Sequence, residues 1–366
     1  MTEKLSEGES AMLDLIRGAA AQAVRVGHAM VFFDIYPRVA DPHPLLIQNA
    51  GVLVFFVLSG FLISYTVDQK RISPQYRFRT YFVDRFVRIF TAYAPALLLI
   101  LALDLVFLAV RGAERYRFSG AFNLLTFAGN VAMLQDFPAW EVVPRLPLGA
   151  HLRITSFGSG RPLWTVAIEW WMYLLFGFLV FRREFRMPRA MQATVLAMLL
   201  IVPFWNIGGR GNGLTFVWFV GVAVLLLRNS RLRELRRREA FGAAAVVAVA
   251  AVWRLRLANL DVYEPLFAAL LAVIFLLILI GLREVHAGGD GVTVRAIRRV
   301  ADYSFSLYLV HYSVLVFLAE YKTVMSRWSL FAIALVVCNV LAYAFASVTE
   351  FHHKSVRATV ARRFGV

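Results

Sequence analysis

The chain has 366 residues, 60% of them hydrophobic, and its mean hydropathy is +0.66. Soluble domains are nearer half apolar and do not contain many apolar runs of about 20 residues, so the composition excludes a soluble protein and indicates an integral membrane protein. The net charge is +16, and the basic residues cluster in short loops between apolar runs. This distribution follows the positive-inside rule and argues against a nucleic-acid partner. The single cysteine, Cys338, excludes a disulfide framework.

The apolar runs predict ten membrane-spanning helices, with both termini in the cytoplasm and a single domain over residues 1–366. The spans are expected at 12–33, 49–67, 89–110, 162–181, 190–206, 214–227, 240–254, 265–282, 303–319 and 330–348. Residues 34–48 then form an outer loop, and the basic loops 68–88, 228–239 and 283–299 lie inside. This all-helical arrangement satisfies the charge bias of every basic segment.

Residues 121–134 form a shorter apolar stretch, which we expect not to cross the membrane. If it crossed, the strongly basic run at 182–189 would lie outside. A re-entrant or interfacial helix is therefore predicted within a large outer region, 111–161. The polar and aromatic residues of this region, Trp140 among them, suit a carbohydrate, because an indole stacks on a sugar face. The alternative is a folded cap that only seals the helices.

The first predicted span carries charged residues and a histidine at membrane depth. Ionisable groups are expensive there and usually face a helix-bundle interior or a watery cavity. Arg17 and His28 are eleven positions apart. On a helix they lie on the same face, within about 20° of each other around the axis and about 16 Å apart along it. The pattern suggests a phosphate anchor below a reaction centre, although a histidine hydrogen-bonded between helices fits equally well.

Two further constellations lie in later spans. Arg85 and Arg88 are neighbours on one helix face at the predicted cytoplasmic end of a span, where they suit either a phosphate clamp or lipid headgroups. Glu169 has Thr165 and Tyr173 one turn away on either side. A carboxylate at this depth needs a partner or a proton. It could orient a histidine or bind sugar hydroxyls, and a purely structural ion pair remains open.

A fourth constellation is a polar stripe on the span at 303–319. Ser304, Tyr308 and His311 follow one another at helical spacing, which favours a hydrogen-bonded packing seam for the first two and leaves the role of His311 open. Ser59 lies in a small-residue break that favours close helix packing. The sequence has no phosphate-binding glycine loop with its lysine, no HExxH or CxxC, and no GxSxG. The sequence therefore lacks the motifs typical of ATPases, zinc enzymes and serine hydrolases, and no metal site is expected.

Together these motifs resemble the acyltransferase-3 family of multi-pass membrane O-acyltransferases. The resemblance rests on the spacing of Arg17 and His28, on Arg85 and Arg88, and on three segments in order: FFVLSGFLIS at 55–64, LWTVAIEWWMYLLF at 163–176 and YSFSLYLVHYSV at 303–314. It covers essentially the whole chain. Arg25, three residues before His28, departs from the apolar residue usual in the family, and so does the Trp-Trp-Met that follows Glu169.

The resemblance implies transfer of an acyl group, with acetyl expected, from cytoplasmic acyl-coenzyme A to a hydroxyl of a cell-surface or secreted carbohydrate. It implies a bacterial inner-membrane protein surrounded by lipid, with a homo-oligomer left open. His28 is then the expected catalytic histidine, as general base or transient acyl carrier, and Glu169 is the second expected catalytic residue. Arg17, Arg85 and Arg88 are the expected donor-binding residues, and Tyr173, His311 and Trp140 are expected at the acceptor. The alternative is a secondary transporter or flippase for a polar or lipid-linked sugar.

Overall fold

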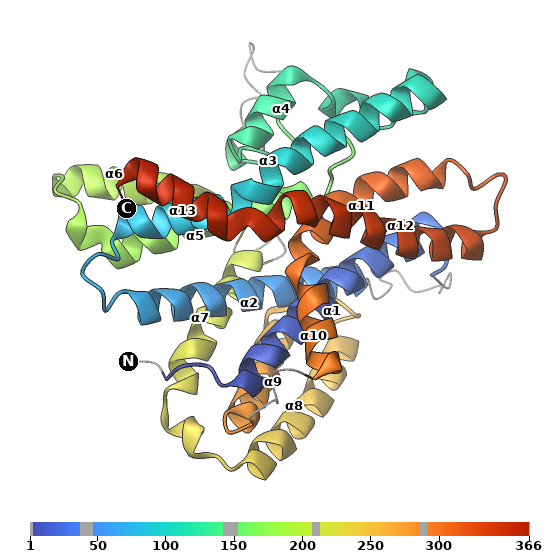
Figure 1. Ribbon diagram of the computed structural model, residues 1–366. Helices are drawn as coiled ribbons and strands as arrows, with labels where there is room; N and C mark the ends of the chain where they lie inside the picture. Colours follow the sequence, from blue (N-terminus) through green and yellow to red (C-terminus); the bar gives the residue numbers. More distant parts are fainter. Residues whose placement is uncertain (1–2, 37–46, 142–152, 207–212, 286–290, 366) are drawn as a thin grey trace. The chain divides into compact units, whose positions relative to one another are not determined.

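The computed structural model describes residues 3–36, 47–141, 153–206, 213–285 and 291–365, and the regular elements in these ranges are all helices (Figure 1). The α-helices are α1 (Glu7–Phe32), α2 (Ile47–Lys70), α3 (Phe78–Arg111), α4 (Leu124–Val131), α5 (Leu163–Phe181), α6 (Arg189–Trp205), α7 (Leu214–Arg228), α8 (Arg237–Leu257), α9 (Pro265–Leu282), α10 (Val292–Asp302), α11 (Ser304–Ala319), α12 (Arg327–Val348) and α13 (His353–Phe364). The predicted all-helical class is confirmed. Parts of the predicted loops 34–48, 111–161 and 283–299 lie outside the described residues.

Six described helices are long and apolar enough to cross a membrane, namely α2, α3, α5, α8, α9 and α12. A seventh candidate is the pair α10 and α11, which is bent by 56°. The predicted number of ten spans is not confirmed. Of the remaining predicted spans, α1 carries several charged side chains, and α6 and α7 have only 17 and 15 residues. The eight-residue α4 is far shorter than the roughly 20 residues that a spanning helix needs, as expected for the stretch 121–134.

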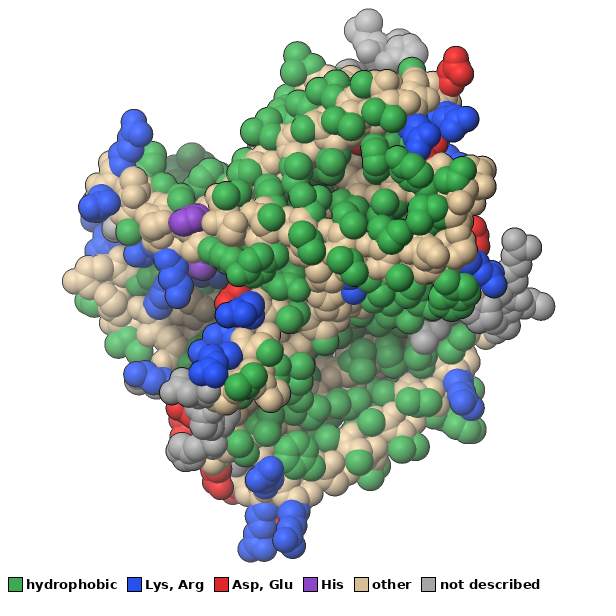
Figure 2. Space-filling model, turned by 45° about the vertical axis from the view of Figure 1, so that its right-hand side comes forward, with side chains coloured by type: hydrophobic (Ala, Val, Ile, Leu, Met, Phe, Trp, Pro, Cys, Tyr) green, Lys and Arg blue, Asp and Glu red, His purple; other side chains and the backbone are tan. Residues whose placement is uncertain are grey.

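Large apolar side chains on several of these helices are exposed. Leu98 on α3, Trp253 on α8 and Val340 on α12 are examples, each more than half exposed. Hydrophobic side chains form wide patches on the face drawn in Figure 2. Exposed apolar area of this extent is unusual on a soluble monomer and is what lipid-facing helices present.

The helices divide between two compact units, and unit 1 comprises residues 1–27, 37–76 and 206–304. Here α2 packs on α7, and α8 packs on α9. Glycines allow the backbones of α2 and α7 to meet: a Cβ at Gly60 would lie 2.0 Å from the Trp218 carbonyl oxygen, and one at Gly221 would lie 2.2 Å from that of Val57. The Trp218 indole also donates to Ser59 Oγ at 3.1 Å. This agrees with the packing role expected for the small-residue break.

Unit 2 comprises residues 28–36, 77–205 and 305–366, and α3 is its longest α-helix. The Tyr81 hydroxyl of α3 donates to the Tyr173 carbonyl of α5 at 2.8 Å. A short 3₁₀ turn, η8 (Glu350–His352), follows α12, and α13 continues beyond it in nearly the same direction and packs against α3 (Figure 1). There Arg357 Nε donates to Asp84 Oδ1 at 2.8 Å. These contacts join the C-terminal segment to the first turns of α3.

Candidate functional site

Two histidines from distant parts of the sequence meet within unit 2. His28 Nδ1, near the C-terminal end of α1, lies 3.0 Å from His311 Nε2 on α11. The two rings stack with centroids 5.2 Å apart and planes 25° apart. His311 is fully buried and His28 is partly buried. The structure thus brings together the predicted catalytic histidine and a histidine expected at the acceptor.

The surrounding hydrogen bonds define which ring nitrogens carry protons. His311 Nδ1 lies 3.0 Å from the Leu307 carbonyl oxygen and 2.9 Å from that of Tyr308. Carbonyl oxygens only accept, so this nitrogen carries a proton and, in the neutral ring, Nε2 is an acceptor. His28 Nδ1 is then the donor, and the lone pair of the His28 ring lies on Nε2. This tautomer is the one that a general base acting through Nε2 requires.

A cavity of about 420 Å³ lies one aromatic ring away from His28. Tyr312 lines it and packs edge-on against His28, with centroids 5.3 Å apart, and against Phe32 at 5.0 Å. The apolar lining consists of Val31, Phe32, Phe107, Phe118, Val316 and Ala319. The charged lining consists of Arg115, Arg117, Glu320 and Lys322. All of these residues belong to unit 2, at the C-terminal ends of α1, α3 and α11 or just beyond them.

The predicted carboxylate site on α5 is also assembled in unit 2. The Tyr173 hydroxyl donates to Glu169 Oε1, so the two residues form a short hydrogen-bonded pair. One turn earlier, Thr165 Oγ1 and the Tyr308 hydroxyl share a hydrogen bond, and the Tyr308 hydroxyl also donates to the Pro162 carbonyl at 3.2 Å. This network joins α5 to α11, the helix that carries His311. Tyr308 therefore belongs to a packing seam, as the sequence favours.

The arginine pair near the start of α3 has two different environments. Arg88 Nη2 lies 3.2 Å from Glu350 Oε1, and the other oxygen of that buried carboxylate accepts from the Ser306 backbone N–H and hydroxyl, both at 2.9 Å. Arg85 instead lies over the Tyr81 ring, 6.0 Å from its centroid. Arg88 therefore balances a buried charge, whereas Arg85 is held by an aromatic face.

The other predicted site residues lie elsewhere. Arg17 is in unit 1 and pairs with Asp14 one turn earlier on α1, at 2.9 Å. Trp140, in the 3₁₀ turn η3 (Pro138–Glu141) of unit 2, donates its indole N–H to the Leu134 carbonyl at 2.7 Å. The only hydrogen-bond donor of the Trp140 side chain is thus used within the protein, and a ligand could contact only its half-buried ring.

A family model described as an acyltransferase domain, of the acyltransferase-3 type, matches residues 11–347. The match runs across both units and includes the histidine pair. The chain belongs to the acyltransferase-3 family. It is therefore a membrane acyltransferase, and acyl transfer is its general activity. Comparisons with curated proteins and with solved structures give no match.

This acyltransferase contains a buried carboxylate that the sequence reasoning missed. Asp104, on α3, accepts from the Tyr116 hydroxyl at 2.7 Å and from the Ser159 backbone N–H at 2.8 Å. Ser159 Oγ in turn donates to Ser313 Oγ, two residues after His311, at 2.6 Å. Burial raises the pKa of the Tyr116 phenol, and the neighbouring Asp104 carboxylate raises it further, so the phenol remains a donor. An aspartate inside an apolar span was the signal that could have identified this site.

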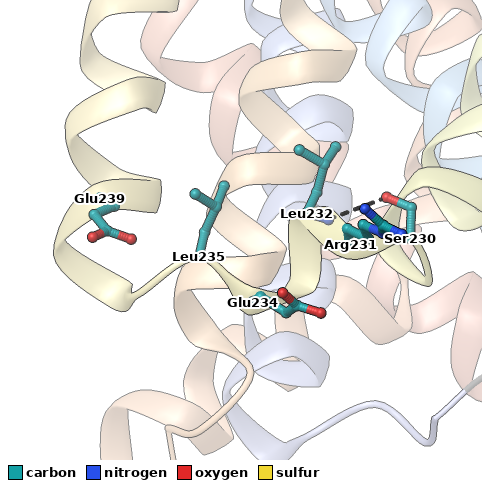
Figure 3. Close-up of a pocket in the computed structure, with 6 residues that line it drawn as sticks. All are labelled: Ser230, Arg231, Leu232, Glu234, Leu235 and Glu239. Carbon is teal, nitrogen blue, oxygen red and sulfur yellow. Dashed lines mark hydrogen bonds between the residues drawn. The ribbon is translucent and has the colours of Figure 1, made fainter.

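A second cavity, of about 440 Å³, lies in unit 1 of the acyltransferase (Figure 3). Its lining comes from the connection between α7 and α8, which includes the 3₁₀ turn η7 (Arg231–Glu234), and from the first turn of α8. The dashed line in Figure 3 marks the Leu232 N–H donating to Ser230 Oγ. This cavity contains none of the predicted site residues. Among the residues that the structure describes, no group of three or more His, Cys, Asp or Glu side chains could hold a metal ion.

Proposed function

We propose that the protein transfers an acyl group, with acetyl expected, from cytoplasmic acyl-coenzyme A to a hydroxyl of a cell-surface or secreted carbohydrate. The observation that carries this proposal is the pairing of His28 with His311 beside the cavity lined by Tyr312. Family membership favours this acyl-transfer role over the alternative of a sugar transporter or flippase.

In this proposal His28 Nε2 accepts the proton of the acceptor hydroxyl as its oxygen attacks the carbonyl carbon of the thioester. The tetrahedral intermediate then expels the thiolate of coenzyme A, which takes up the proton from His28. In the alternative route, Nε2 itself attacks the thioester carbonyl carbon and expels the thiolate of coenzyme A. The acyl-histidine then passes the acyl group to the hydroxyl, whose proton is taken up by the thiolate. Both routes use the same lone pair, and His311 maintains it by holding the proton on His28 Nδ1.

The two ends of α3 suggest opposite sides for donor and acceptor. Arg85 and Arg88 lie near its predicted cytoplasmic end, and the cavity residue Phe107 lies nineteen positions after Arg88, at most about 28 Å along the helix because Pro95 lies between them. This distance is close to the roughly 30 Å thickness of the hydrocarbon core. We therefore place the phosphates of the donor at these arginines and the carbohydrate at the cavity. Arg17 remains a predicted donor-binding residue.

Mass spectrometry of surface glycans tests this function. Cells that contain the protein should carry glycans with an added acyl mass, and cells without it should not. His28→Ala should remove the acyl mass while the protein is still present at normal levels in the membrane. Glycans that are identical in all three strains would overturn the proposal.

A further inference from the structure

The cavity beside His28 combines apolar walls with a cationic rim. Aromatic rings from Phe32, Phe107 and Tyr312 contribute to its walls. Arg115, Arg117 and Lys322 are exposed, so the cavity meets the surface where these side chains lie. Aromatic faces in a cavity that approaches a catalytic histidine suit the apolar face of a sugar ring.

The charges at this rim do not balance. Arg115 pairs with Glu320 at 3.6 Å, and Lys322 pairs with Asp34 at 3.1 Å. In the described part of the chain, no ion pair involves Arg117. Arg111, four residues after Phe107, adds another cation, which lies 4.6 Å from the centroid of the Tyr321 ring. The rim therefore has an excess of positive charge, and Arg117 is the cation most available to a ligand.

We infer that the acceptor is an anionic carbohydrate, whose carboxylate or phosphate group binds Arg117 while the acylated sugar unit lies against the aromatic walls. This inference rests on the proposed function and specifies its substrate class. A guanidinium presents a planar fork of donors that matches a carboxylate or a phosphate, and such charge-assisted contacts are stronger than neutral ones. An acidic sugar can bind the Arg117 guanidinium and stack on the aromatic rings at the same time, whereas a neutral sugar can only stack on the rings.

The position of the rim also fits this role. Phe32 is one helical turn beyond His28, about 6 Å along the axis of α1, and both residues contact Tyr312. A sugar in the cavity is therefore separated from His28 by the Tyr312 ring. A lipid headgroup could also meet Arg117, because exposed arginines near a membrane bind lipid phosphates. In that case Arg117 would not affect the transfer of the acyl group to the glycan.

The test compares two arginine variants by their effect on acylation. Arg117→Gln removes the rim cation, and Arg256→Gln removes an exposed arginine that follows the predicted span 240–254 on its outer side and does not line the cavity. Mass spectrometry identifies the acylated unit and measures the extent of acylation in each strain. We expect the acylated sugar, or the unit next to it, to carry a carboxylate or phosphate. Arg117→Gln should lower acylation on the order of tenfold to a hundredfold. Arg117→Lys should restore part of it, and Arg256→Gln should leave it unchanged.

The outcomes separate this inference from the proposed function. If wild-type cells add no acyl group to any glycan, the proposed function is overturned, and the inference with it. If the acyl group is found on a neutral unit with neutral neighbours, the function stands and the anionic acceptor is overturned. If the acceptor is anionic but Arg117→Gln is as active as Arg256→Gln, the assignment of Arg117 is overturned, as binding of lipid headgroups alone would require.

Discussion

His28 and His311 meet through Nδ1 and Nε2 at 3.0 Å, and the second nitrogen of His311 is held by two backbone carbonyls. In the proposed mechanism, this arrangement makes His311 a positioning residue for His28. It selects the tautomer of His28 in the way that a backbone or carboxylate partner does at many catalytic histidines. The Leu307 and Tyr308 carbonyls of α11 therefore determine, through His311, which nitrogen of His28 carries the proton.

His311→Phe should lower kcat by about 10²–10³-fold and leave KM for both substrates nearly unchanged. The phenyl ring keeps the stacking but loses the acceptor that holds the proton on His28 Nδ1, so the productive tautomer becomes a minor form. Initial rates of purified protein over a range of substrate concentrations measure this separation. A fall in kcat that is accompanied by a large fall in melting temperature would instead assign His311 a structural role.

The histidine pair shows what sequence reasoning can and cannot predict here. The spacing of charges in the first span made His28 a candidate, and the polar stripe containing His311 was evident from helical periodicity. Their contact joins residues 283 positions apart, and nothing in local patterning specifies which helix faces which. Tyr312 was overlooked because an aromatic residue is ordinary in an apolar helix, and local patterning does not show that it lines a cavity.

The number of membrane spans was harder to predict than the all-helical fold class. Long apolar runs correspond to α2, α3, α5, α8, α9 and α12, because length and hydropathy alone define them. The stretches at 190–206 and 214–227 form helices close to the expected bounds, yet each is short for a span. The contact of Arg88 with Glu350 could not be predicted either, because the sequence suggested phosphate groups or lipid headgroups for this arginine and not a buried carboxylate 262 positions away.

Arg85 and Arg88 should differ when each is replaced by alanine. Both variants should weaken the binding of acyl-coenzyme A, because both lose a donor for its phosphates. Only Arg88→Ala should also lower the melting temperature, since it leaves the Glu350 carboxylate buried without its counter-charge. Donor titration and thermal unfolding in detergent measure the two effects. Glu350→Gln in the Arg88→Ala background should recover stability without recovering donor affinity. Unchanged donor affinity in both single variants would assign these arginines to lipid anchoring.

Asp104 should prove essential for the structure around the cavity. Asp104→Ala removes the acceptor for the Tyr116 hydroxyl and the Ser159 N–H, and each buried donor left without a partner costs about 1–3 kcal/mol. We expect a lower melting temperature and increased protease cleavage within residues 153–161. Tyr116→Phe is the matched control, because it deletes one of the two donors and should have a clearly smaller effect. An Asp104→Ala protein as stable as the Tyr116→Phe protein would contradict this role.

The sidedness of the chain can be tested with two cysteines in a Cys338→Ser background. Gly120 lies in the predicted outer region, is exposed, and has no heavy atom within 4 Å of the position that a Cβ would take, so Gly120→Cys should be tolerated and accessible. Arg183 is exposed in the basic run that the positive-inside rule places in the cytoplasm. An impermeant thiol reagent applied to intact cells, with the outer membrane permeabilised where one is present, should label Gly120→Cys and not Arg183→Cys. Both should be labelled after the inner membrane is opened, which controls for reactivity. Labelling of both in intact cells would place residue 183 outside as well and overturn the predicted topology. Labelling of Arg183→Cys alone would reverse the predicted sides. The cavity beside His28 would then no longer face the compartment of the carbohydrate, and Arg85 and Arg88 would no longer face that of the donor.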